Sequence, residues 1–219
     1  ASERKRPPIL RESGRLFLQP DREVVMNARL VVLGILLAVA GEGRASAGHS
    51  IWLEAEQFTS TGGWAQDAQF IDQMGSPYLL ATGMGAPVED AVTTFDPPVA
   101  GRWRVWARTL DWIPDHHPGR FQIVLAGKPL DHTFGTAGKA GWHWEDGGTV
   151  ELAGSTEIRL HDLTGYYGRC DAVVLTSDLD WTPPDDVAAV ESLRIEHGAL
   201  RPVETIGPSD VVVIGGGLA

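Results

Sequence analysis

The sequence predicts an all-β chain whose main domain, residues 48–178, is an antiparallel β-sandwich. From Ile51 to Asp178, short apolar or alternating segments are separated by Gly, Pro and Asp roughly every 8 to 15 residues. No helical period of useful length interrupts them. Many short strands joined by regular turns are typical of antiparallel sandwiches and barrels, whereas α/β folds need helices between their strands.

The first expected strand, 51–58, alternates between two faces. Trp52, Glu54 and Glu56 lie on one face, and Leu53 and Ala55 lie near the other. Two carboxylates on one face repel each other and need a partner if they are half buried. A hard cation bound by oxygen ligands would supply that partner. Alternatively, both acids face water on an edge strand.

The remaining strands follow from the same alternation and turn residues. The segment 101–110 is the clearest, because Trp103, Val105 and Ala107 alternate with arginines and Trp106. The other expected strands, each bounded by turn residues, are 68–72, 78–82, 91–95, 121–125, 131–134, 142–144, 148–152, 156–163 and 172–176.

Composition limits the function. The chain of 219 residues has a formal net charge of −11, which argues against nucleic acid as a partner because phosphate binding needs clustered Lys and Arg. The single cysteine, Cys170, excludes an internal disulfide and a thiolate zinc cluster. No Ser or Cys lies in a recognisable nucleophile elbow, so no catalytic triad is predicted.

Residues 1–47 are expected to precede the mature protein. Residues 1–25 are basic and polar and lack a sustained period, which predicts a disordered upstream extension. Residues 26–47 predict a signal peptide, with a short basic start, an apolar run and an Ala-Ser-Ala cleavage site at 45–47. The expectation is a secreted or periplasmic protein without membrane contact after cleavage. The alternative is a buried N-terminal helix.

The sequence changes character after Asp178. Residues 179–208 form a predicted linker, in which Pro183-Pro184-Asp185-Asp186 signals the start of a short helix. This helix is expected at 187–196, with Val187, Val190 and Leu193 along one side.

Residues 209–219 form an apolar strand that runs into Gly215 and Gly217. A Gly-x-Gly after such a strand resembles the start of FAD-dependent oxidoreductases, where glycines let the backbone approach a pyrophosphate. The resemblance implies the truncated first strand of a Rossmann-type FAD domain. FAD would then bind only in a full-length parent, and this chain alone would be inactive.

Three segments of the sandwich carry a second resemblance: Leu53-Glu54-Ala55-Glu56, residues 102–108 and residues 170–175. They resemble galactose-binding-like jelly rolls, specifically carbohydrate-binding modules of families 6 and 35. In those modules the paired first-strand acids and the last-strand aspartate commonly hold a structural calcium ion. The resemblance therefore implies calcium at Glu54, Glu56 and Asp171, with backbone carbonyls completing the shell.

The order of signal peptide, sandwich, Pro-rich linker and FAD-type strand also resembles secreted bacterial FAD-dependent oxidoreductases, some of them xanthan-lyase-like. This resemblance implies an accessory, carbohydrate-binding domain, with a polysaccharide or oligosaccharide and its own missing flavin domain as partners. Two alternatives stay open. One is a purely structural domain that packs on the flavin domain. The other is a polysaccharide lyase, for which the sequence offers no visible cluster of base, acid and charge neutraliser.

Sugars bind such sandwiches through an aromatic platform flanked by polar side chains. The candidates, which lie in segments rich in Trp, Tyr and His, are Trp112, His116, Trp142, Trp144 and Tyr167. Trp142 and Trp144 point to the same side of their strand, so core packing is an equal alternative for both. Packing of the aromatic residues on the flavin domain is another.

Overall fold

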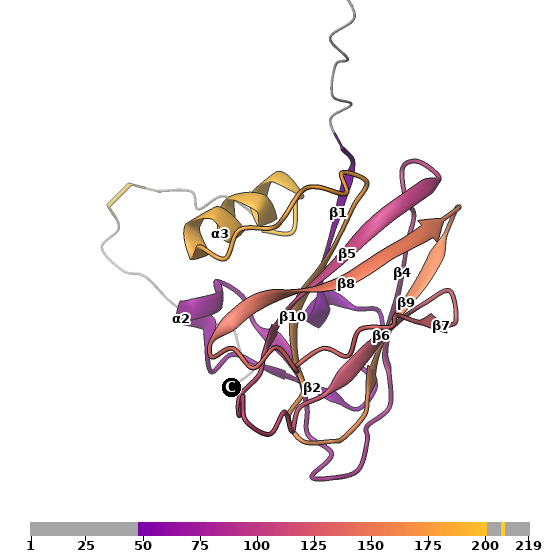
Figure 1. Ribbon diagram of the computed structural model, residues 1–219. Coiled ribbons are helices and arrows are strands. Elements are labelled where there is room, and N and C mark those ends of the chain that lie inside the picture. Colours follow the sequence, from indigo (N-terminus) through magenta and orange to yellow (C-terminus); the bar gives the residue numbers. More distant parts are fainter. Residues whose placement is uncertain (1–47, 201–206, 209–219) are drawn as a thin grey trace, which may run out of the picture. The chain divides into compact units, whose positions relative to one another are not determined.

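The computed structural model describes residues 48–200 and 207–208. Two antiparallel sheets pack face to face in this part of the chain (Figure 1), so the all-β sandwich is confirmed. The extension at 1–25, the signal peptide at 26–47 and the FAD-type strand at 209–219 lie outside the described residues, and they stay predictions.

The larger sheet has the strand order β2-β3-β10-β5-β8, and β1 also pairs with β10. One of its inner strands, β5, lies between β10 and β8 and has the bounds expected from the sequence, and from Val105 onward the residues on both of its faces are buried. The members are β1 (Ser50–Glu54), β2 (Trp64–Asp67), β3 (Tyr78–Ala81), β5 (Gly101–Leu110), β8 (Trp142–Leu152) and β10 (Arg169–Thr176).

The smaller sheet has the order β4-β9-β6-β7. The first three of these strands follow the expected segments closely, because each alternates buried and partly exposed residues. The members are β4 (Ala91–Phe95), β6 (Phe121–Leu125), β7 (Lys128–Pro129) and β9 (Thr156–Asp162).

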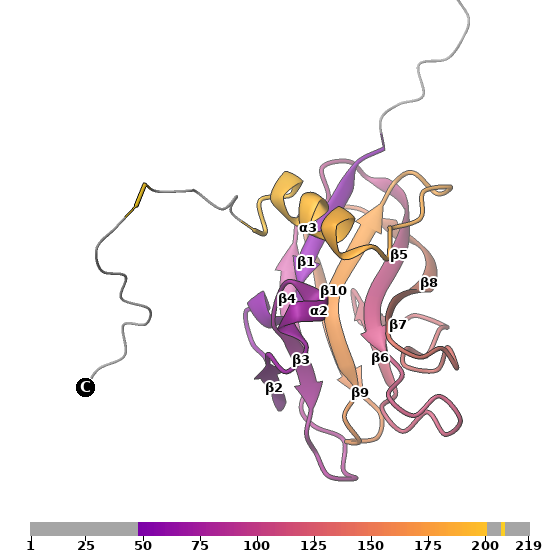
Figure 2. The same cartoon turned by 90° about the vertical axis from the view of Figure 1, so that its left-hand side faces the viewer.

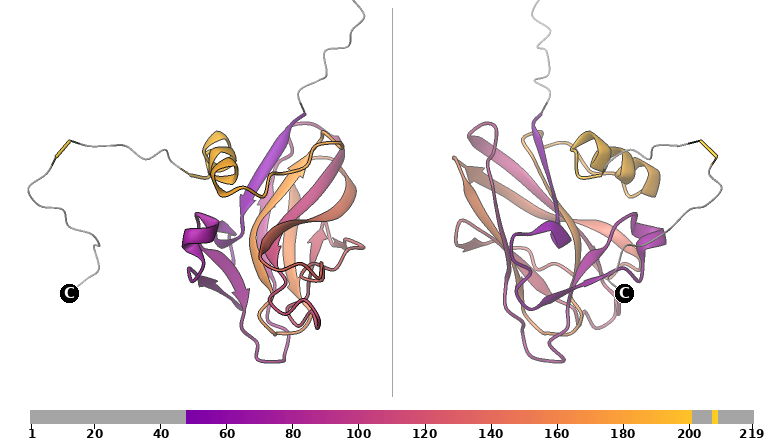
Figure 3. Two further views of the ribbon diagram at one scale, coloured as in Figure 1. Left: turned by 60° about the vertical axis from the view of Figure 1, so that its left-hand side comes forward. Right: turned by 180° about the vertical axis from the view of Figure 1, so that it is seen from behind.

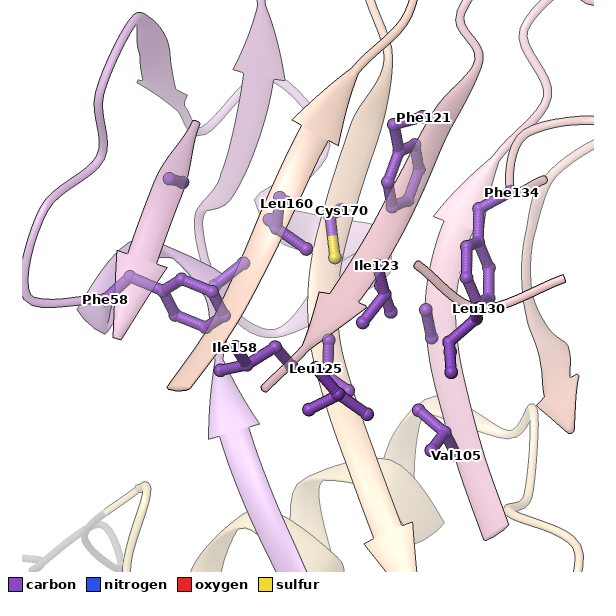
Figure 4. Packing of buried hydrophobic residues seen from close by; sticks show 14 of the residues in the cluster. Phe58, Val105, Phe121, Ile123, Leu125, Leu130, Phe134, Ile158, Leu160 and Cys170 are labelled. Carbon is purple, nitrogen blue, oxygen red and sulfur yellow. The ribbon is translucent and has the colours of Figure 1, made fainter. Parts of the chain in front are cut away.

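The main core fills the space between the two sheets (Figure 4). Phe121, Ile123, Ile158 and Leu160 of the smaller sheet are fully buried against side chains of the larger sheet, among them Val105. Burial of large apolar side chains contributes roughly 1.5–3 kcal/mol each. This core therefore fixes which face of each strand points inward.

A second apolar cluster lies on the outer face of the larger sheet. Trp52, Trp106 and Val174 pack there against Val190 of α3 (Val187–Glu196). Figures 2 and 3 show α3 lying across the strands β1 and β10. The helix begins as expected, since Asp186 caps it by accepting a hydrogen bond from the backbone N–H of Ala189.

Three sequence expectations were wrong in detail. The strand expected at 68–72 is replaced by α2 (Ile71–Met74), which ends at Gly75 in the left-handed conformation. The segment 131–134 contributes only an isolated bridge at Phe134. The two strands expected around residue 146 are one strand, β8, because Gly147 and Gly148 form a bulge rather than an end.

The first strand also ends earlier than expected. β1 stops at Glu54, and a 3-10 turn, η1 (Ala55–Gln57), follows. Glu56 therefore does not continue the strand face that carries Trp52 and Glu54. Period-two alternation does not reveal where a strand gives way to a tight turn.

Asp162 joins the loops at one end of the sandwich. Its side chain is fully buried and accepts hydrogen bonds from the backbone N–H groups of Val88, Thr164 and Gly165. Gly165 has a φ of 68°, and a Cβ there would lie 2.1 Å from the carbonyl oxygen of Ala86. The loops 83–90 and 163–168 are thus held in close contact.

We expect Asp162→Ala to lower the free energy of unfolding by about 3 kcal/mol, because three N–H groups lose a charged acceptor. Urea unfolding followed by tryptophan fluorescence measures the change. The control is Asp96→Ala, which removes an exposed carboxylate and should be nearly neutral. Equal stability of the two variants would contradict this role of Asp162.

Candidate functional site

Three loops meet at the end of the sandwich that Asp162 organises: 83–90, 111–120 and 163–168. The hydroxyl of Thr164 donates a hydrogen bond to the carbonyl of Pro118, which ties the last two loops together. Gly119 packs against the backbone at Tyr167, where a Cβ would lie 2.8 Å from the carbonyl oxygen. These contacts leave little room for the loops to rearrange.

Aromatic residues gather on this loop end. The Trp112 indole N–H donates to the carbonyl of Tyr166 at 3.1 Å, and the rings of Trp112 and Tyr167 meet edge to face with centroids 5.7 Å apart. The guanidinium of Arg169 lies 5.5 Å from the centre of the Trp112 ring. Tyr166 is 49% exposed. We call Trp112, Tyr166, Tyr167 and Arg169 the aromatic loop end.

Sequence reasoning chose Trp112 and Tyr167 as ligand-binding residues and noted Tyr166 beside Tyr167, but it did not choose Arg169. The Tyr-Tyr pair was visible as a motif, whereas the position of Arg169 depends on strand β10 beginning there. The Nε of Arg169 is buried without a hydrogen-bond partner, and one Nη donates to the carbonyl of Tyr167 at 2.9 Å.

His116 lies in the same loop as Trp112 and is exposed. Its neighbour His117 instead turns to Asp111, with 2.5 Å between the imidazole Nδ1 and the carboxylate. The backbone N–H of Gly138 donates to the same carboxylate oxygen. This pair fixes the start of the loop, whereas His116 is exposed in the same loop as Trp112.

The structure places Trp142 and Trp144 in β8, opposite Leu110 and Arg108 of β5, and both rings pack on other aromatic side chains. The ring of Trp142 packs on Tyr78 at 4.8 Å. The ring of Trp144 packs on Trp52 at 5.5 Å, and its N–H donates to the carbonyl of Pro184. Both contacts favour packing over a sugar platform for these two residues.

Two of the three acids expected to hold calcium share one cation, the guanidinium of Arg194. Its Nε donates to Glu54 at 2.6 Å, and one Nη donates to Asp171 at 2.7 Å. Arg108 also donates to Asp171, at 3.2 Å. Burial raises the pKa of Glu54 and of Asp171, and the guanidinium charges oppose that rise.

Glu56, the third expected calcium ligand, has no such partner. Its Oε2 is buried and accepts no hydrogen bond. Burial, followed by the charge of Glu54, raises the pKa of Glu56 to about 8. At neutral pH this carboxyl is therefore mainly protonated, which is the form that a buried acid without a counter-charge adopts.

The structure describes only some of the residues on which the other expected sites depend. Among residues 48–200 and 207–208, no group of three or more His, Cys, Asp and Glu side chains is arranged to hold a metal ion. No helix in that part of the chain has the length and apolar character needed to cross a membrane. Gly215 and Gly217 lie outside the described residues, so FAD binding stays a prediction.

A groove that sequence reasoning missed lies between the β7 turn and β8. It has a volume of about 720 Å³ and is lined by apolar residues, glycines, Thr149 and the side chains of Lys128, Asp131, His132, Asp146 and Glu151. No aromatic residue lines it apart from the imidazole of His132. The groove forms because a bulge in β8 meets the β6–β7 turn, which residue spacing does not reveal.

Behind the groove, Glu145 is buried between two histidines. His132 Nε2 lies 2.7 Å and His143 Nε2 lies 3.4 Å from its carboxylate, and the backbone N–H of Gly135 donates to it. Burial alone would raise the pKa of Glu145, but the hydrogen bond with His132 and the nearby imidazole of His143 outweigh it and lower the pKa to about 2.

We expect stability to depend on Glu145 in acid. Its folded-state pKa lies below the unfolded value, so its stabilisation is complete above about pH 4.5 and is lost as the pH falls towards 2. The full effect corresponds to about 3 kcal/mol. Urea unfolding at several pH values should show a flatter acid limb for Glu145→Gln than for wild type. The exposed control Glu151→Gln should keep the wild-type slope, and an equal slope in all three proteins would contradict the prediction.

Several solved structures are similar to this chain. The GH26-CBM35 β-(1,4)-mannanase of Podospora anserina is 20% identical, with a TM-score of 0.48, and the match covers 61% of this chain and 29% of that one. The C-terminal CBM6 of a marine laminarinase from Zobellia galactanivorans is 16% identical, with a TM-score of 0.46, over 59% of this chain and 100% of that one.

A family 35 carbohydrate-binding module from Clostridium thermocellum is 20% identical, with a TM-score of 0.45, over 57% of this chain and 98% of that one. No protein-family model and no curated protein matches the sequence. At these identities and TM-scores the likenesses decide nothing about a ligand. The fold class rests on the strand pairing of this chain itself.

Proposed function

We propose that this domain binds a polysaccharide or oligosaccharide at the aromatic loop end. The observation that carries the proposal is the meeting of Trp112 and Tyr167 beside the exposed ring of Tyr166. The CH groups of a pyranose stack on aromatic rings, while its hydroxyls need hydrogen-bond partners. Both kinds of surface occur together here, since His116 is exposed in the same loop as Trp112.

The rigidity of the loops supports this proposal. Asp162 and Thr164 bind backbone groups of neighbouring loops, and Gly165 and Gly119 allow close backbone contact. A binding surface that is ordered before the ligand arrives loses less conformational entropy on association. A platform built from these loops therefore favours affinity for a flat, weakly interacting ligand such as a sugar ring.

Two other surfaces support the proposal less well. α3 covers the aromatic cluster of Trp52 and Trp106 on the outer face of the larger sheet. The groove beside β8 is open, but it offers charged side chains without an aromatic ring of Trp, Tyr or Phe. Neither surface combines an exposed aromatic ring with free polar groups.

The test is calorimetric titration of the full chain with soluble mannan, xylan, β-glucan and uronic acid oligosaccharides. At least one of them should bind to the wild-type protein. Trp112→Ala and Tyr166→Ala should each weaken that binding by at least tenfold, because each removes a stacking surface, and the far-ultraviolet circular dichroism should not change. A tenfold loss is about 1.4 kcal/mol.

Two control variants test the location. Val99→Ala shortens an exposed apolar side chain outside the loop end, and Lys128→Ala removes a charge from the groove. Both should bind like the wild type. Loss of binding in Lys128→Ala with normal binding in Trp112→Ala would place the ligand in the groove and refute the proposal. Absence of binding to every oligosaccharide would instead favour a structural role for the aromatic surface.

A further inference from the structure

Arg194 is an unusually enclosed arginine. It lies in the last turn of α3, is only 1% exposed, and reaches inward past the ring of Trp52, which is 5.5 Å from its guanidinium carbon. Besides the carboxylates of Glu54 and Asp171, it binds the backbone carbonyl of Met74. One side chain thus connects α3 with β1, β10 and the end of α2.

The groups around these two carboxylates are hydrogen-bond donors. Glu54 accepts from the indole N–H of Trp52 at 2.8 Å, and Asp171 accepts from the hydroxyl of Ser76 at 2.8 Å. Arg194 and Arg108 supply the remaining N–H groups. Calcium needs six to eight oxygen ligands at about 2.3–2.6 Å. A shell made of N–H donors and one hydroxyl group does not fit it.

The charges are already balanced without a metal ion. Two guanidinium groups, those of Arg108 and Arg194, face the two carboxylates of Glu54 and Asp171. The third acid, Glu56, does not join this network. A divalent ion would have to displace Arg194 from a fully enclosed position and leave that guanidinium buried without its two partners, which is costly.

We propose that Arg194 replaces the calcium ion that the sequence resemblance implies. Its guanidinium is the permanent counter-charge of Glu54 and Asp171, supplied by a helix that follows the sandwich in the sequence. The helix α3 is then part of the folded domain rather than part of a linker. This inference is independent of carbohydrate binding, which is proposed at the aromatic loop end and does not involve Arg194.

The first test is thermal unfolding of the full chain with calcium and with EGTA. The wild-type midpoint should be the same in both, because a ligand that binds only the folded state would raise it. Arg194→Met should lower the midpoint by roughly 6 °C or more, since two buried carboxylates lose their partner. Arg102→Met removes an exposed arginine of β5 and should change the midpoint by little.

The second test does not require the Arg194 variant to fold. Terbium serves as a luminescent probe for calcium sites, and an ion at Glu54 would be sensitised by Trp52, whose indole is bonded to that carboxylate. Wild type and Glu54→Gln should therefore give the same tryptophan-sensitised emission. Emission that is lost in Glu54→Gln, or a wild-type midpoint that rises with calcium, would overturn the proposal. A wild-type midpoint in Arg194→Met would overturn it as well.

Discussion

Glu54 and Asp171 lie on neighbouring strands, and both carboxylates are removed from water, so the larger sheet needs a buried positive charge to be stable. Arg194 meets this need from outside the sheet. Its bonds also fix the place of α3, and the apolar contacts of Val190 with Trp52 and Trp106 then follow from that placement. The ion cluster and the apolar cluster stabilise the same helix.

The helix α3 covers the outer face of the larger sheet and so limits where a ligand can bind. Trp52, Trp106 and Trp144 would form an aromatic surface if α3 and the Pro-rich segment before it were absent. With these segments in place, Tyr166 of the loop end is the one Trp, Tyr or Phe residue in the described part of the chain that is exposed. The proposed binding site is thus partly a consequence of how the chain folds back after β10.

Local patterns predicted the strands well where one face is buried. β4, β5 and β6 were expected with their observed bounds, and α3 was expected from the Pro-Pro-Asp-Asp signal and the period of its apolar residues. Expectations failed where a turn or a bulge decides the geometry, as after Glu54 and at Gly147. Arg194 could not be found from spacing, because its partners lie 140 and 23 residues away. Glu54 does have a cationic partner, as two acids so close together require, but the sequence does not reveal that this partner is an arginine side chain.

The smaller sheet ends in a very short edge strand, β7. β7 consists of only Lys128 and Pro129, and both are exposed. Proline has no N–H to offer a neighbouring strand, and a charged lysine opposes close approach by another sheet. Two copies of the domain therefore cannot readily join edge to edge along β7. At high local concentrations this blunt edge helps the domain to remain dispersed instead of aggregating.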